Sequence, residues 1–98
     1  YIQTPIINPN KESVWAQYSI QVKNRNLVQK KLSAKNIPTA IHYPKPLHLQ
    51  KCFEYLGYKK GDFLISERVS NNIISLPMNP YISDDEINYI AKELKMII

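Results

Sequence analysis

The chain of 98 residues has one cysteine and two glycines, and it contains no long hydrophobic run. A single thiol, Cys52, cannot close an internal disulfide, so a disulfide-stapled domain is excluded and a reducing compartment, the cytoplasm, is expected. No stretch approaches the roughly 20 apolar residues that a membrane-spanning helix needs, so no membrane partner is expected. Neither Gly57 nor Gly61 opens a glycine-rich turn before a helix, which argues against a phosphate-cradling loop.

The composition and length of the chain indicate one small basic domain. Hydrophobic residues make up 44% of the chain and charged residues 21%, as in a folded domain. Thirteen lysines and arginines against eight acidic residues give a formal charge of +5, which suits an anionic partner. A chain this short buries only about 60 to 65% of its unfolded surface. Because it also begins with Tyr1 rather than methionine, we expect a piece of a longer chain whose missing part holds the chemistry.

The first third of the chain predicts a loop, a strand and the start of a helix. Residues 1–12 carry two prolines and no periodic pattern, so we assign them to an extended linker or leading loop, ahead of a domain at residues 13–98. Residues 14–22 place apolar side chains at every second position, which predicts a strand with one buried face. Asn24 or Asn26 can cap the helix that follows.

That helix is predicted to end at Asn36, because asparagine tolerates the left-handed conformation and the following Ile37-Pro38 prevents continuation. The remaining segments are short: extended at 39–43, helical at 49–56, helical from Asp62 as its cap to about residue 71, extended at 73–76, and helical after a capping box of Ser83 and Glu86. This order predicts an α+β fold, with a small, largely antiparallel or mixed sheet and helices packed on one face.

The segment at residues 41–48 reads IHYPKPLH and concentrates two imidazoles, a phenol and an ammonium. Its two prolines fix the backbone and lower the entropy lost when a ligand orders the segment. A pre-organised ligand site is therefore one interpretation. A rigid turn with a hydrogen-bonded histidine is the other, and the residues alone leave both open.

Other chemistry is less well supported. His42, His48 and Cys52 lack a fourth ligand at metal spacing, so no metal site is predicted. We expect Cys52 to be a small buried hydrophobe, because its helical neighbours are apolar. The lysines fall on predicted helix exteriors and turns, which favours a solvated face over nucleic-acid binding. A stand-alone basic nucleic-acid-binding module and a structural dimerisation domain remain as alternatives.

Several groups of residues, taken in order, are similar to a known family. They are SVWAQY at 13–18, NIPTAIHYPKPLH at 36–48, LGY at 56–58, GDF at 61–63, Glu67, and LPMNP at 76–80. The string HYPxPLH is specific, and its order with the later groups argues against coincidence. Nearly the whole chain resembles the C-terminal small domain of PLP-dependent nucleotide-sugar aminotransferases of the DegT/DnrJ/StrS type.

The resemblance implies a homodimeric parent enzyme of aspartate-aminotransferase-like fold, which transfers an amino group from glutamate through PLP (pyridoxal 5'-phosphate) to a keto nucleotide-sugar. In that family the Schiff-base lysine lies in the large domain. No catalytic or cofactor-binding residue is therefore assigned here, and the chain alone is expected to be inactive. The resemblance further implies that His42 and Tyr43 face the sugar substrate, and that His48 either contacts it or caps the following helix. Asn79 stands where relatives often carry a histidine and receives no role.

Overall fold

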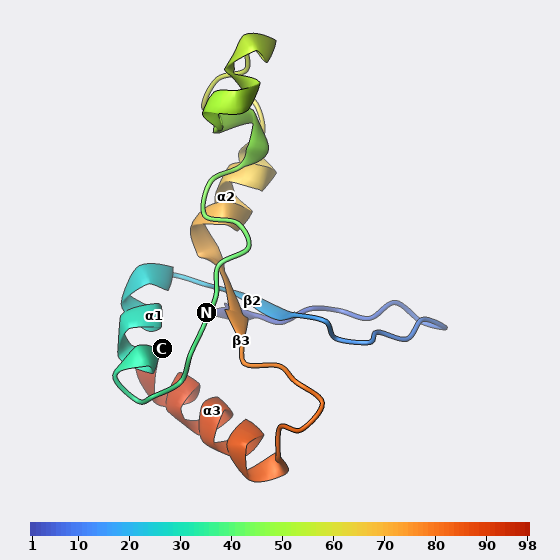
Figure 1. Cartoon of the computed structure of the whole chain (residues 1–98), viewed down its shortest axis with the longest axis vertical. Coiled ribbons are helices and arrows are strands. Elements are labelled where there is room, and N and C mark those ends of the chain that lie inside the picture. The colour runs from blue at the N-terminus through green and yellow to red at the C-terminus, as the bar shows by residue number, and fades with distance from the viewer.

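Three antiparallel strands and three α-helices make up the computed structural model, which describes residues 1–98 (Figure 1). The strands are β1 (Ile2–Gln3), β2 (Tyr18–Val22) and β3 (Ile73–Leu76), and they lie side by side in that order. The helices are α1 (Arg25–Ser33), the short 3₁₀-helices η1 (Leu47–Leu49) and η2 (Lys51–Leu56), α2 (Leu64–Asn72) and α3 (Asp84–Ile97). The predicted α+β class is confirmed, and both strand pairs are antiparallel.

The hydrophobic core lies on one face of the sheet, where α1 and α3 pack. Alternation along β2 turns Ile20 and Val22 to this face, beside Ile74 of β3. The seven core residues come from four elements and one turn: Ile20, Val22, Val28, Leu32, Ile37, Ile74 and Leu94. The predicted packing of helices on one face is thus confirmed for α1 and α3. The other face of the sheet carries small polar side chains, among them Ser19 and Ser75.

Helix α1 ends at Ser33, three residues before the predicted end, and the turn that closes it contains the predicted left-handed asparagine. Asn36 has a φ of 59°, and its N–H donates to Ser33 O at 3.0 Å. The next N–H, of Ile37, donates to Leu32 O at 3.0 Å. These two hydrogen bonds satisfy the last carbonyl groups of the helix and turn Ile37 into the core against Leu32. The chain then leaves toward the segment that carries His42.

Helix α3 begins with the predicted capping box. The N–H of Glu86 donates to Ser83 Oγ at 3.2 Å, and the N–H of Ser83 donates to Glu86 Oε2 at 2.8 Å. The Ser83 hydroxyl also donates to Glu86 Oε2 at 2.9 Å, and the two hydrogen bonds that Ser83 donates to this carboxylate lower the pKa of Glu86 below its ordinary value. At the other side of the core, Lys35 Nζ lies 3.3 Å from Glu93 Oε2, and the Tyr89 hydroxyl donates to Lys35 O at 3.2 Å. Helix α3 is therefore tied to the end of α1 by polar contacts as well as by the core.

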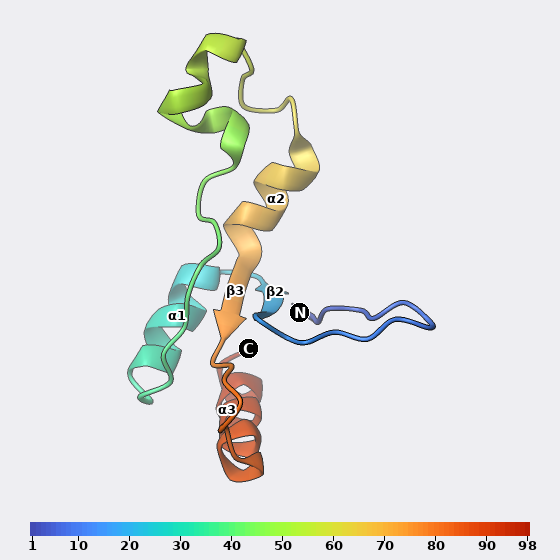
Figure 2. The ribbon, with the colours of Figure 1, turned by 45° about the vertical axis from the view of Figure 1, so that its right-hand side comes forward.

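Residues 44–72, with η1, η2 and α2, project from the sheet as an arm. Figure 2 shows this arm extending away from the sheet at the end opposite α3. The molecule measures 48 × 36 × 23 Å and has a radius of gyration of 15.5 Å, against about 13 Å for a compact chain of this length. Only 12 of the 98 residues are buried, so most of the arm lies at the surface. None of the helices combines the length and apolar character that a membrane crossing requires.

The strand predicted for residues 14–22 is shorter in the structure. Residues 14–17 lie outside the sheet, where Val14 is 94% exposed and Trp15 has a φ of 48°. Strand β3 pairs with β2 only from Tyr18 onward, so residues 14–17 have no partner strand. Alternation marks residues that can form a strand, but it does not reveal whether a partner strand is present.

Two other extended segments also differ from expectation. The leading loop predicted at residues 1–12 contains β1, whose Ile2 pairs with the end of β2. The strand predicted at residues 39–43 is reduced to one bridge, in which Ala40 exchanges both backbone hydrogen bonds with Ser75. Prolines on both sides of this segment lack the N–H groups that a longer ladder needs.

Three expectations for the arm are wrong in detail. The helix predicted at residues 49–56 consists of 3₁₀ turns interrupted at Gln50. Cys52 is exposed rather than buried, because no residue of η2 is covered by another layer. Asp62 does not cap α2: its Oδ2 accepts the N–H of Lys59 at 2.7 Å and closes the preceding turn, and α2 begins without a side-chain cap.

Candidate functional site

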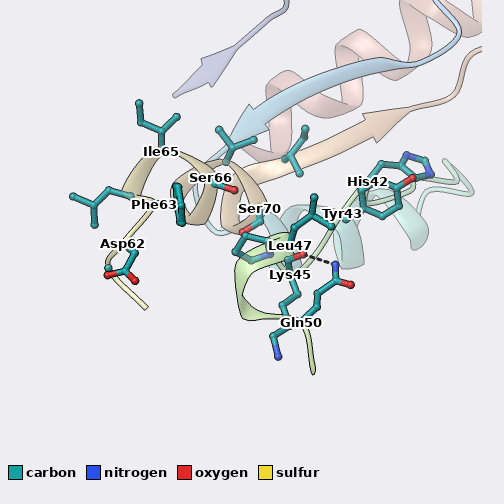
Figure 3. A pocket seen from close by; sticks show the side chains of 15 residues that line it. His42, Tyr43, Lys45, Leu47, Gln50, Asp62, Phe63, Ile65, Ser66 and Ser70 are labelled. Atoms are coloured by element: carbon teal, nitrogen blue, oxygen red, sulfur yellow. Dashed lines mark hydrogen bonds between the residues drawn. The ribbon is translucent and has the colours of Figure 1, made fainter. Parts of the chain in front are cut away.

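A cleft lies between the proline-bearing segment of residues 42–50 and α2 (Figure 3). Its volume of about 850 Å³ falls in the range of small-molecule sites, roughly 300 to 1,000 Å³. The segment lines one wall with His42, Tyr43, Lys45, Pro46, Leu47 and Gln50. The other wall comes from the turn before α2, from α2 itself and from β3: Gly61, Asp62, Phe63, Leu64, Ile65, Ser66, Val69, Ser70 and Ile73.

His42 and Tyr43 lie together at one end of this cleft, away from Asp62 and Phe63 (Figure 3). Their rings meet edge to face, with centroids 5.7 Å apart and an interplanar angle of 80°. Tyr43 is 71% exposed, and its hydroxyl forms no hydrogen bond within the chain. His42 is half-buried, and its Nδ1 lies 3.3 Å from Ser75 Oγ. A phenol and one ring nitrogen are therefore available to a ligand.

The same wall carries one cation. The Gln50 side-chain amide donates to the carbonyl oxygen of Lys45 at 3.3 Å, which is the dashed line in Figure 3. Lys45 itself is exposed and pairs with no carboxylate of the chain. Asp62 is the one acidic residue in the lining, and its Oδ2 is engaged by the Lys59 N–H. The cleft lining therefore carries one unpaired cation, which raises the potential toward an anionic ligand.

His48 is not brought together with His42 and Tyr43. It is buried between η1 and α2, where its Nε2 lies 3.1 Å from Glu67 Oε1 and its ring packs on Phe63 at 4.8 Å. Its expected alternative role as a helix cap is wrong, because η2 has no side-chain cap. Contact between His48 and a substrate stays a prediction, and within the chain this side chain fastens η1 to α2.

Glu67 is the centre of that fastening. Besides facing His48, its Oε1 accepts the N–H of Gly61 at 2.7 Å. The Gly61 hydrogen bond and then the His48 contacts hold the pKa of Glu67 below its ordinary value. Phe63 also packs against Tyr58, with ring centroids 5.0 Å apart. The Glu67 carboxylate and the Phe63 ring thus connect the turn before α2 to η1, through His48. The two walls of the cleft are thereby held at a fixed separation.

Sequence reasoning missed two residues that shape the site. Glu67 belonged to the recognised pattern but received no role, and Ser75 was one small residue of a predicted strand. Their partners lie 19 and 33 positions away, at His48 and His42 respectively. No local pattern marks such pairs. A lone serine in the middle of a short apolar strand is the only signal that the sequence offered.

Much apolar surface is left uncovered. A groove of about 420 Å³ between the sheet and α3 is lined by 13 residues, of which 11 are hydrophobic, including Trp15, Tyr18 and Met78. No group of three His, Cys, Asp or Glu side chains lies close enough to hold a metal ion. The fold and the cleft define a small α+β lobe with an open cleft, one wall of which carries polar and aromatic side chains.

The chain belongs to the DegT/DnrJ/EryC1/StrS aminotransferase family, because the sequence model of that family matches residues 1–95. The family resemblance inferred from the motifs at residues 36–48 and 76–80 is therefore confirmed. The two alternatives, a nucleic-acid-binding module and a structural dimerisation domain, are not favoured by this match.

Individual relatives agree with this assignment. The chain is 38% identical over 93 residues to the UDP-2-acetamido-2-deoxy-3-oxo-D-glucuronate aminotransferase of Pseudomonas aeruginosa, a match that covers 95% of the chain and 25% of that protein. It is also similar to a crystal structure of a DegT/DnrJ/EryC1/StrS aminotransferase from Brucella abortus, with a TM-score of 0.87, 36% identity, and coverage of 97% of the chain and 26% of that structure. A structure described as a sugar aminotransferase from Streptococcus pneumoniae in its PLP form gives a TM-score of 0.85 at 27% identity, with 98% and 26% coverage. The chain thus spans about a quarter of the length of these relatives.

The expected relation to the aminotransferase fold is confirmed by these neighbours, and it raises the question of where PLP would bind. A Schiff-base lysine needs a desolvated or otherwise depressed amine. Every lysine of the chain is exposed, and Lys45 in the cleft lies between two prolines with its amine in solvent. No lysine of the chain therefore fits the Schiff-base position of a PLP site.

Proposed function

We propose that the chain is the C-terminal small domain of a PLP-dependent aminotransferase, which transfers an amino group from glutamate to a keto nucleotide-sugar. In this proposal the chain supplies part of the wall that binds the sugar. The observation that carries it is the open end of the cleft, where the exposed Tyr43 phenol and the half-buried His42 imidazole each keep a free hydrogen-bonding group. The relative from P. aeruginosa is named for a 3-oxo UDP-sugar, which supports the substrate class.

The chemistry of these groups suits such a substrate. A phenol both donates and accepts hydrogen bonds, and a neutral imidazole can do either at its free nitrogen, so both can bind sugar hydroxyls or a uronate carboxylate. The unpaired ammonium of Lys45 raises the local potential toward a diphosphate. We also propose His48 as a third substrate-binding residue, as the family resemblance implies; within the chain its Nε2 faces Glu67 Oε1. The bound cofactor supplies the bond-making chemistry, and this domain binds and orients.

The proposal extends to partners and location. Since no lysine of the chain fits the cofactor, we propose that the chain alone does not transaminate and that the remaining three quarters of the enzyme carry the Schiff base. A homodimer is proposed, as the family resemblance implies. The cytoplasm is the proposed location, because the exposed and unpaired thiol of Cys52 suits a reducing compartment.

The test replaces His42 by Ala and Tyr43 by Phe in the intact aminotransferase. Each change removes hydrogen bonds to a neutral sugar group, each worth roughly 0.5 to 1.5 kcal/mol, so we expect KM for the nucleotide-sugar to rise about 2- to 10-fold. Tyr81→Phe is the matched control, because Tyr81 is 91% exposed and lies outside the cleft. If both cleft variants keep the KM of the wild type, the proposed role of this wall is wrong.

A further inference from the structure

We infer that Ser75, backed by Ser19, is a positioning residue that fixes the imidazole of His42 so that Nε2 is the ring nitrogen presented to the ligand. This inference rests on the proposed function only for the presence of a ligand that binds His42. The observation behind it is a continuous row of three polar groups on the face of the sheet opposite the hydrophobic core.

Each of the three groups lies within hydrogen-bonding distance of the next. Ser19 of β2 and Ser75 of β3 are directly opposite in the antiparallel register, and their Oγ atoms are 2.8 Å apart. Ser75 Oγ lies 3.3 Å from Nδ1 of His42. Ser75 is buried, so its hydroxyl must find its hydrogen-bond partners within the protein, and these two groups provide both. The pairing of Nδ1 leaves Nε2 as the free nitrogen.

Ser75 also holds the backbone of the same segment. Its N–H donates to Ala40 O at 2.8 Å, and the Ala40 N–H donates to Ser75 O at 3.1 Å. Ala40 lies two residues before His42, so one residue of β3 fixes both the path of the chain into the cleft and the orientation of the ring. No other residue of the sheet contacts both the backbone and the side chain of this segment by hydrogen bonds.

The row of hydroxyls is compatible with both tautomers of His42. In one arrangement the Ser75 O–H donates to Nδ1 and accepts from the Ser19 O–H, so that the proton of the ring is on Nε2. In the other, Nδ1–H donates to Ser75 Oγ and the Ser75 O–H donates to Ser19 Oγ, so that Nε2 is an acceptor. The two arrangements differ by rotation of both hydroxyl hydrogens and by transfer of the ring proton between Nε2 and Nδ1, and the heavy atoms keep their positions. Nε2 can therefore donate to or accept from a sugar hydroxyl without movement of the ring.

A purely structural role is the competing explanation, because a pair of serines across two strands also stabilises a sheet. The two roles differ in what they do to His42. If the serines only stabilise the sheet, then Ser75→Ala resembles any other change that loosens β3. Ile74→Val is the matched control, because Ile74 is the neighbouring residue of β3 and its side chain lies in the core on the opposite face.

The experiment combines NMR of the imidazole nitrogens of His42 in the full chain with kinetics of the intact aminotransferase. We expect Ser75→Ala to shift the Nδ1 and Nε2 resonances and to raise KM for the nucleotide-sugar about 3- to 10-fold with kcat within about twofold, an effect of the size of one lost hydrogen bond. Ser75→Thr keeps a hydroxyl at the same place and should restore both values. Ile74→Val should lower the melting temperature and change neither.

Wild-type nitrogen resonances in Ser75→Ala, or equal behaviour of Ser75→Ala and Ile74→Val, would overturn the inference. If Ser75→Ala fails to fold, Ser19→Ala tests the same row, because it leaves Ser75 in place and should shift Nδ1 in the same direction by a smaller amount. Unchanged His42 nitrogen resonances in Ser19→Ala would refute the proposed effect of this hydrogen-bonded row on the ring. A separate result distinguishes the proposed function: if His42→Ala keeps the wild-type KM while Ser75→Ala still shifts the His42 nitrogens, the positioning stands and the substrate role fails.

Discussion

Asn36 is the position where one substitution should most clearly change stability through the backbone. Its φ of 59° lies in the left-handed region, and the two hydrogen bonds that close α1 require it. A residue with a β-carbon pays roughly 1 to 2 kcal/mol in this conformation, and asparagine is among the few that tolerate it. We therefore expect Asn36→Ala to lower the free energy of unfolding by about 1 kcal/mol.

Asn36→Gly is the second variant to compare, because glycine adopts a positive φ without steric cost. Asn36→Gly removes the steric cost, but glycine loses more backbone entropy on folding, roughly 0.5 to 1 kcal/mol. The two effects nearly cancel, so stability should stay within about 0.5 kcal/mol of the wild type or rise slightly. The predicted order of stability is Gly equal to or above Asn, and both above Ala.

Thermal unfolding followed by circular dichroism measures these differences. A loss of 1 kcal/mol lowers the melting temperature of a domain of this size by about 4 to 8 °C. Asn26→Ala is the control, since Asn26 is an exposed residue inside α1 and alanine is the better helix former there. The reasoning is refuted if Asn36→Ala melts at the wild-type temperature, or if Asn36→Gly is the less stable of the two variants.

Two further predictions concern the core and the response to pH. Leu32 is fully buried, so Leu32→Ala should cost about 2 to 5 kcal/mol in urea unfolding, and a cost below 1 kcal/mol would contradict the described core. The pKa values of Glu67 and Glu86 are lowered from 4.5, so the unfolded chain binds more protons between the unfolded and folded pKa values. Their stabilisation is present above about pH 4.5 and is lost as the pH falls through the folded pKa values, which melting curves between pH 7 and pH 3 would show. Glu67→Gln and Glu86→Gln should each flatten that dependence, and an unchanged slope in both would refute it.

Local signals predicted the parts of the fold that depend on neighbouring residues. The box of Ser83 and Glu86 and the terminating Asn36 are short-range devices, and both occur where they were predicted. Residues that depend on distant partners were predicted less well. Residues 14–17 alternate like a strand without a neighbour to pair with. Asp62 is a local exception, because its Oδ2 accepts the N–H of Lys59, three residues earlier, instead of capping α2.

The same division applies to the site. The string that contains His42 and Tyr43 is compact enough to be noticed in the sequence, and the structure places both at one cleft. The contacts that hold them could not be noticed. Ser75 and Glu67 act on histidines from other elements, and only the folded chain brings them together. Cys52 shows the converse, because apolar neighbours in sequence did not imply that another layer covers it.

The substrate role of Tyr43 and His42 is tested most directly by a crystal structure of the intact aminotransferase with the proposed nucleotide-sugar substrate bound. We predict that Tyr43 Oη and His42 Nε2 lie within about 2.6 to 3.2 Å of sugar oxygen atoms, and that His42 Nδ1 remains on Ser75. A complex in which the sugar is bound elsewhere, with both rings facing solvent or the interior of the lobe, would contradict it.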